Sequence, residues 1–106
     1  MDPFLKIRVE TPDPKTVLLR CEGEFAGMDV LGKESEIVGG VERAGGGNVV
    51  FDFSNVSYID SAGVGIIYKC VKKAKERGLA ISVYGAADDI KKIMTAAALH
   101  KLIQFL

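Results

Sequence analysis

The 106-residue sequence is poor in the residue types from which most catalytic sites are built. It has a single histidine, His100, near its end, which gives a Ser-His-Asp arrangement little support. Its two cysteines, Cys21 and Cys70, lie far apart in apolar stretches, which favours buried, reduced thiols over a disulfide. No Cys/His cluster has metal-ligand spacing. We therefore expect no catalytic residue, no metal and no cofactor, and we expect that the protein is not an enzyme.

A net charge is also lacking, because 14 basic residues balance 14 acidic ones. Nucleic-acid-binding proteins normally carry a basic excess, so we expect no nucleic-acid partner. The balance hides an asymmetry: residues 1–60 hold 11 acidic and 6 basic residues, whereas residues 61–106 hold 3 and 8.

Long apolar runs are missing as well, since none approaches the about 18–20 residues that span a bilayer. The N-terminal segment Met1-Asp2-Pro3-Phe4 lacks the basic and apolar parts of a signal peptide. We therefore expect a cytoplasmic protein with no membrane partner.

The sequence does have the length and composition of one small globular domain, residues 1–106, with 48% hydrophobic and 26% charged residues. Alternating apolar residues predict a strand at about 4–10 and a second one around Val17 to Cys21. Thr11-Pro12-Asp13-Pro14 between them favours a turn. An antiparallel hairpin should therefore begin the fold.

Helices and strands alternate along the rest of the chain. The spacing predicts helices over 29–44 and 62–77 and a third that Asp88 or Asp89 caps, and strands at 49–53, at 79–84 and within 102–106. Strands that are separated by helices pair in parallel. The expected fold is therefore α/β: a single domain with a mixed sheet of four to five strands, an N-terminal antiparallel hairpin, and helices packed against the sheet.

The strand-to-helix turn within residues 51–65 is the most informative segment. We expect Ser61 to be the N-cap of the following helix, a structural role worth about 1 kcal/mol that competes with any functional one. At about 100° per residue, the core side of that helix is formed by Gly63, Ile66, Ile67, Cys70, Val71 and Ala74. Gly65 then faces solvent, with Val64 and Tyr68 at the margin. An outward glycine lets another molecule approach closely, which suggests a docking surface centred on Ser61.

A serine in this position also suits phosphorylation. Free amides and the helix dipole at an N-terminus stabilise a phosphate by roughly 0.3–2 kcal/mol. The phosphate would add about −1.5 to −2 charges beside Asp60. A partner that presses acidic or apolar groups against Val64 and Gly65 would then be repelled, at a cost on the order of a few kcal/mol that abolishes a micromolar complex.

The chain resembles the STAS domains of bacterial anti-sigma factor antagonists. The resemblance rests on Gly23-Glu24-Phe25, on the strand from Val49 to Phe53 and on the segment Ile59-Asp60-Ser61-Ala62-Gly63-Val64-Gly65, and it extends from about Leu5 to Phe105. It implies a protein that binds an anti-sigma factor and so releases a sigma factor. In this family the anti-sigma factor is a serine kinase that phosphorylates the serine after the aspartate, here Ser61, and a metal-dependent serine phosphatase removes the phosphate. The partner-binding residues are expected to be Asp60, Ser61, Ala62, Gly63, Val64, Gly65, Tyr68, Gly23 and Glu24.

Two positions depart from the pattern of this family. Ala26 stands where the antagonists usually carry an aspartate, and Ala98 stands where many relatives have a glycine, which we attribute to packing. STAS domains also occur in other assemblies. The alternative is thus a non-phosphorylated STAS subunit of a larger complex, such as an accessory protein of a transporter ATPase, in which Ser61 is only a cap and a contact.

Two further patterns leave alternatives open. The basic run on the helix over 62–77 is usually a solvated face, which is the favoured interpretation, but it could also steer an acidic partner. Its members are Lys69, Lys72, Lys73, Lys75 and Arg77. Gly63-Val64-Gly65 starts like a dinucleotide-binding fingerprint, yet Tyr68 stands where the third glycine should fall. A small hydrolase or nucleotide-binding enzyme is therefore the least supported function.

Overall fold

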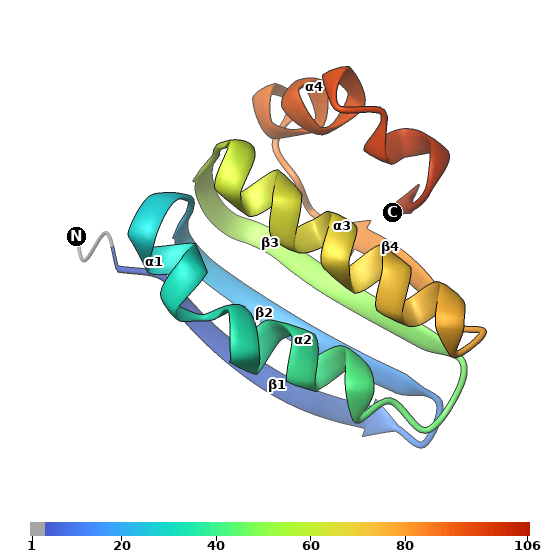
Figure 1. Ribbon diagram of the computed structural model, residues 1–106. Coiled ribbons are helices and arrows are strands. Elements are labelled where there is room, and N and C mark those ends of the chain that lie inside the picture. The colour runs from blue at the N-terminus through green and yellow to red at the C-terminus, as the bar shows by residue number, and fades with distance from the viewer. Residues whose placement is uncertain (1–3) are drawn as a thin grey trace.

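The computed structural model describes residues 4–106; residues 1–3, which belong to the segment without a signal-peptide pattern, lie outside the described residues (Figure 1). The elements follow in this order: β1 (Lys6–Asp13), β2 (Thr16–Phe25), α1 (Gly27–Gly32), α2 (Glu34–Glu42), β3 (Asn48–Ile59), α3 (Ser61–Glu76), β4 (Ala80–Tyr84), α4 (Asp88–Ala96), the 3-10 helix η1 (Leu99–Lys101) and β5 (Gln104–Phe105).

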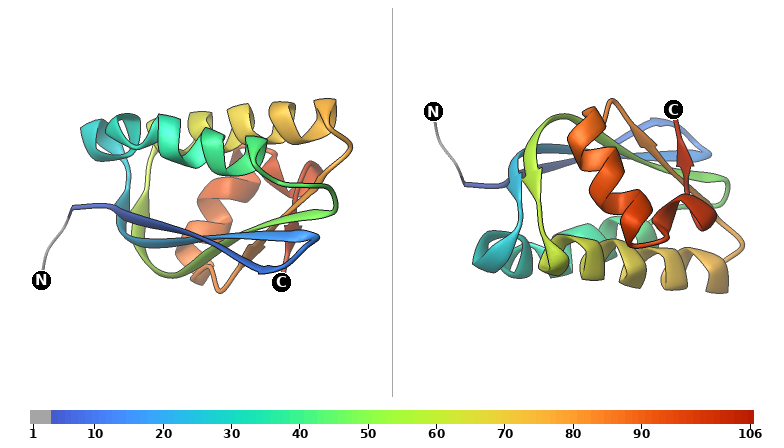
Figure 2. Two further views of the ribbon diagram at one scale, coloured as in Figure 1. Left: turned by 90° about the horizontal axis from the view of Figure 1, so that it is seen from below. Right: turned by 90° about the horizontal axis from the view of Figure 1, so that it is seen from above.

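The five strands form one sheet in the order β1-β2-β3-β4-β5. β1 and β2 are antiparallel, and the other neighbours are parallel. α1, α2 and α3 cover one face of the sheet, and α4 lies beyond α3 on the side of β4 and β5 (Figures 1 and 2). The predicted fold class, an α/β domain with a mixed sheet and an N-terminal antiparallel hairpin, is confirmed.

The turn of the hairpin lies further along the chain than predicted. β1 continues through Pro12 to Asp13, and the turn is at Pro14 and Lys15, where the Lys15 amide donates to the Asp13 carboxylate at 2.8 Å. A proline is tolerated in β1 because this strand is at the edge of the sheet, where a missing N–H removes no necessary ladder bond. The prediction of a turn over Thr11 to Pro14 was therefore wrong by about three residues at its start.

The predicted helix over 29–44 is two helices, α1 and α2, which meet at Lys33. Gly32 ends α1, which agrees with the weak helix propensity of glycine. Gly40 inside α2 has a packing reason: a Cβ there would lie 2.7 Å from the Leu19 Cδ2 atom. The missing side chain at position 40 therefore leaves room for Leu19 of β2 against α2.

The core is one apolar cluster between the sheet and the helices. The ring of Phe53 packs against those of Phe25 and Phe51, with distances between ring centroids of 5.0 and 6.0 Å. Cys21 and Cys70 are free and buried, as predicted. Burial raises the pKa of the Cys70 thiol to about 12 and also raises that of Cys21, so both sulfurs are protonated at neutral pH.

The C-terminal segment is attached to α3. The Tyr68 hydroxyl donates a hydrogen bond to the Ala97 carbonyl. The N-cap of α4 is Ala87, so the prediction that Asp88 or Asp89 caps this helix was wrong; both carboxylates lie in its first turn instead. After α4 the chain reverses at Ala98, whose φ of 62° is the only left-handed value at a non-glycine residue among residues 4–106.

The backbone conformation of Ala98, at φ 62°, is one that glycine adopts readily, so the glycine expected here from the family resemblance has a conformational reason rather than a packing one. A non-glycine residue in the left-handed region is strained by about 1–2 kcal/mol. Glycine avoids this strain, but its greater conformational freedom in the unfolded chain cancels part of the gain. We expect Ala98→Gly to raise the free energy of unfolding by about 0.5–1 kcal/mol in urea titrations. Ala97→Gly, at a φ of −87°, is the matched control and should give no increase. An equal gain in both variants would contradict this account.

Candidate functional site

Two helix N-termini lie side by side at one edge of the sheet. β2 and β3 are parallel neighbours that end at the same level, where Phe25 pairs with Ile59. β2 leads into α1 and β3 leads into α3, so both helices begin at this edge (Figure 1). Ligand sites of α/β sheets lie at the carboxyl ends of strands, as this one does.

Asp60 ties the two helix starts together. Its Oδ1 accepts from the Gly63 amide at 3.0 Å, and its Oδ2 accepts from the Gly27 amide at 3.0 Å. Its backbone is extended, with φ −126° and ψ −170°, so Asp60 is the N-cap of α3. The prediction that Ser61 caps this helix was wrong, because Ser61 is already its first helical residue.

Asp60 also explains how α1 begins without a polar cap of its own. The N-cap of α1 is the buried Ala26, which has no side-chain acceptor to offer. The first amide of α1, that of Gly27, binds the carboxylate from the neighbouring strand instead. The start of α1 is thus capped by a long-range acceptor.

The Ser61 side chain is exposed and takes part in no hydrogen bond with any of residues 4–106. Since it is not the cap, it is available to another molecule. Ala62, the next residue, is half-buried and packs against the core. The structure therefore separates the two roles: Asp60 holds the fold, and Ser61 faces solvent.

The two glycines of the first turns of α3 have opposite environments. A Cβ on Gly63 would lie 2.1 Å from the Phe25 carbonyl oxygen, so α3 rests directly on the end of β2. A Cβ on Gly65 would meet nothing within 4 Å. The predicted core side of α3 and its outward Gly65 are both confirmed.

The remaining predicted binding residues lie around this edge and differ in their exposure and contacts. Val64 is half-buried against the core, whereas Tyr68 is 38% exposed and is held by the end of α4 through its bond to Ala97. Gly23, at φ 109°, marks an irregularity in the pairing of β2 with β3, and Glu24 beside it is exposed. Gly23 and Glu24 thus reach the same edge from β2.

Two apolar residues of α1 escaped prediction from the sequence. Met28 is 83% exposed and directly follows Gly27, whose amide binds Asp60, and Leu31 is 49% exposed. A single long helix would place Leu31 beside its core stripe. The break at Lys33 removes it from that stripe, so the signal that could have identified it was the glycine at position 32.

Two members of the basic run on α3, Lys69 and Arg77, bind groups of α2 and the residues that follow it. Lys69 Nζ lies 3.0 Å from the Glu34 carboxylate of α2. Arg77 donates to main-chain carbonyls where α2 ends, including that of Ala44 at 2.8 Å. Lys72 and Lys75 are exposed, which agrees with the interpretation of this part of the run as a solvated helix face.

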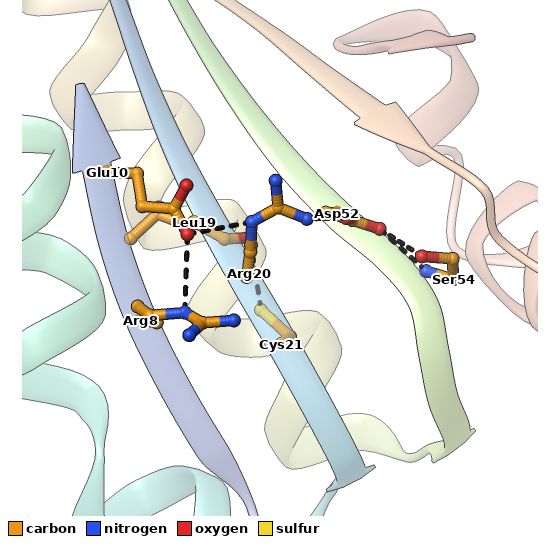
Figure 3. Close-up of polar contacts among 7 residues, drawn as sticks. All are labelled: Arg8, Glu10, Leu19, Arg20, Cys21, Asp52 and Ser54. Carbon is orange, nitrogen blue, oxygen red and sulfur yellow. Dashed lines mark hydrogen bonds and ion pairs between the residues drawn. The ribbon is translucent and has the colours of Figure 1, made fainter. Parts of the chain in front are cut away.

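Asp52 and Asp60, which lie within and directly after β3, do not share partners. Asp52 is within β3 and accepts from Arg20 at 3.2 Å and from the Ser54 amide at 3.0 Å. Arg20 also forms an ion pair with Glu10 at 2.8 Å, and Glu10 forms a second one with Arg8 at 3.2 Å (Figure 3). This row of charges lies on the sheet face opposite the helices.

Among residues 4–106, no three histidine, cysteine, aspartate or glutamate side chains are grouped so that they could hold a metal ion. None of the helices in this part of the chain has the length and apolarity needed to cross a membrane.

The STAS domain family model matches residues 6–106, and the chain therefore belongs to the STAS domain family. An anti-sigma factor antagonist from Mycobacterium paratuberculosis has a similar structure, with 21% identity, coverage of 99% of this chain and 87% of that one, and a TM-score of 0.75. The structure of the Bacillus cell fate determinant SpoIIAA in its phosphorylated form is 17% identical, with coverage of 95% of this chain and 91% of that one, and a TM-score of 0.73. A sulfate transporter family protein from Wolinella succinogenes is 14% identical, with coverage of 91% of this chain and 80% of that one, and a TM-score of 0.74. At these identities the three structures show a shared fold.

Gly63 and Gly65 form a matched pair for a stability test. Gly63→Ala should lower the free energy of unfolding by about 1–3 kcal/mol, because its Cβ would overlap the end of β2. Gly65→Ala should raise it by about 0.5–1 kcal/mol, because alanine is the better helix former and its methyl group meets nothing. Chemical denaturation of both variants measures the two effects, and changes of the same sign would contradict the assigned environments.

Asp60 and Ser61 form a second pair, which tests the position of the cap. Asp60→Ala should cost about 1–3 kcal/mol of stability, since two backbone amides lose their acceptor. Ser61→Ala should change stability by less than about 0.5 kcal/mol, the usual range for a surface position without contacts. Thermal and urea unfolding would reveal the reverse order if Ser61 were the cap.

Proposed function

We propose that this protein is an anti-sigma factor antagonist that binds its partner around Ser61 and is released when Ser61 is phosphorylated. The observation that carries the proposal is the exposed, unbonded Ser61 hydroxyl on the first turn of α3, next to a capping carboxylate that already has its partners. The fold relationship to an anti-sigma factor antagonist and to a protein solved in its phosphorylated form supports it.

The first turn of α3 is suited to carry a phosphate. Gly63 and Val64 donate their amides to Asp60, whereas the amides of Ser61 and Ala62 have no acceptor within residues 4–106. These two donors and the positive end of the helix dipole favour an anion there. The kinase must bind ATP as the phosphoryl donor and provide the base that takes the hydroxyl proton, because no side chain of residues 4–106 is hydrogen-bonded to the Ser61 hydroxyl.

The surroundings of Ser61 make a phosphate disruptive to a bound partner. Met28 and Leu31 of α1 and the half-buried Val64 give this surface an apolar character. A phosphate of about −1.5 to −2 charges would have to be desolvated under the partner. The neighbouring Asp60 carboxylate would add a like charge and could not neutralise the phosphate. The fold would persist, because the Ser61 side chain is exposed and makes no hydrogen bond with residues 4–106.

The proposed protein is therefore a binding module and not an enzyme. Its partners are an anti-sigma factor with serine kinase activity and a serine phosphatase that restores the free hydroxyl. Both would act in the cytoplasm, where sigma factors function.

A second candidate is a STAS subunit of a transporter complex that is not phosphorylated. The similarity to the sulfate transporter family protein favours it. In that case Ser61 would be a contact residue, and the same surface would bind a neighbouring subunit continuously.

Phosphorylation by the anti-sigma factor kinase of the same organism, with Mg²⁺ and ATP, tests the proposal. We expect a mass gain of one phosphate in the wild type and in Ser35→Ala, and none in Ser61→Ala. Ser35 is the matched control, because it is also an exposed serine in the first turn of a helix, α2. Labelling that persists in Ser61→Ala would contradict the assignment.

Binding to the same anti-sigma factor, measured by calorimetry, tests the charge switch. Ser61→Asp should weaken binding by at least about tenfold, whereas Ser61→Asn, of similar size and neutral, should weaken it less. If Ser61→Asp binds as tightly as the wild type, the charge mechanism is wrong. Absence of both phosphorylation and binding would favour the transporter-type subunit.

A further inference from the structure

β1 is an open edge of the sheet. It is eight residues long and pairs with β2 alone, and no element of the described chain, residues 4–106, lies beyond it (Figures 1 and 2). The backbone groups on its outer side are therefore available to another strand. On the helix side of this edge, Ile7 and Val9 are only half-buried, because α2 covers them incompletely.

The other face of β1 has charges of alternating sign. Arg8 and Glu10 project there, with side-chain exposures of 76% and 35%, and their 3.2 Å contact begins the charge row of Figure 3. In an antiparallel pairing of two β1 strands about Val9, each Arg8 lies opposite the Glu10 of the other copy, and Val9 lies opposite Val9. Opposite charges directly across a strand pair are favourable, so β1 is complementary to itself.

We propose that two copies of this chain associate through β1 in this register. The two five-stranded sheets then form one continuous sheet with all helices on the same face, because residues directly opposite each other in an antiparallel pair point to the same side. The half-buried Ile7 and Val9 of the two copies come together and are shielded. In each copy β3 ends near the start of β1, because β2 is antiparallel to β1 and parallel to β3. The two β1 strands run in opposite directions, so the two Ser61 surfaces lie at opposite ends of the joined sheet and stay open.

The neighbouring registers are less favourable. A shift that centres the pair on Arg8 places the two Arg8 side chains opposite each other, which is repulsive. A shift by a single residue turns the apolar row of one copy towards the charged row of the other. Pro12 lies opposite Lys6 in the proposed register, near the end of the pairing, so the contact centres on Ile7 to Thr11. An interface of this length belongs to the small, weak class.

Sedimentation equilibrium of the full chain tests the dimer at concentrations up to about 1 mM. The wild type should be in a concentration-dependent monomer–dimer equilibrium. Arg8→Glu and Glu10→Arg should each weaken it at least about tenfold, because each places like charges opposite one another twice. The double variant R8E/E10R should restore it. An equimolar mixture of the two single variants should form a heterodimer, since two acidic side chains of one variant then face two basic side chains of the other.

Lys6→Glu is the matched control for charge and for register. It should leave the equilibrium unchanged when Pro12 is opposite position 6, and it should weaken the dimer if the pair is centred on Arg8, which would overturn the register. Urea unfolding of each variant checks that the fold is retained, because Glu10 also binds Arg20 within one copy. The proposal is overturned if the wild type is monomeric at every concentration, or if the mixture of single variants does not associate. It does not depend on the function proposed for Ser61.

Discussion

The site depends on one carboxylate that serves two helices. α1 and α3 begin side by side, so the positive ends of their dipoles and their unsatisfied amides meet at the same edge of the sheet. Asp60 lies between them and gives one oxygen to each. Because this acceptor is shared, the position of α1 and the exposure of the Ser61 hydroxyl are both consequences of where β3 ends.

The sequence predicted the parts of this arrangement that follow from periodicity. The alternating strands, the core side of α3 and the outward Gly65 could be found because each is set by side-chain spacing within one element. The cap could not be assigned in this way. Whether Asp60 or Ser61 is the last extended residue is decided by the pairing of Ile59 with Phe25, and the bond from Gly27 to Asp60 joins residues 33 positions apart.

The division between α1 and α2 was hidden for a related reason. The predicted helix contains Gly32 and Gly40, but only the structure shows their separate roles: Gly40 lies against Leu19 of the sheet, and Gly32 ends α1. The charge asymmetry was visible as a difference between two parts of the chain. Its arrangement, with α2 carboxylates opposite α3 ammonium groups such as Lys69, is a property of packing.

Gly65 places stability and recognition in opposition. A side chain at position 65 would point into open space next to the first turn of α3, and this helix would be more stable with alanine there. Selection or engineering for thermal stability alone would replace Gly65 early, since the substitution relieves a local cost and disturbs no neighbour. A partner that approaches this turn closely would lose its fit while the protein itself became more robust. Under the function proposed above, position 65 is thus where a gain in folding stability would reduce binding.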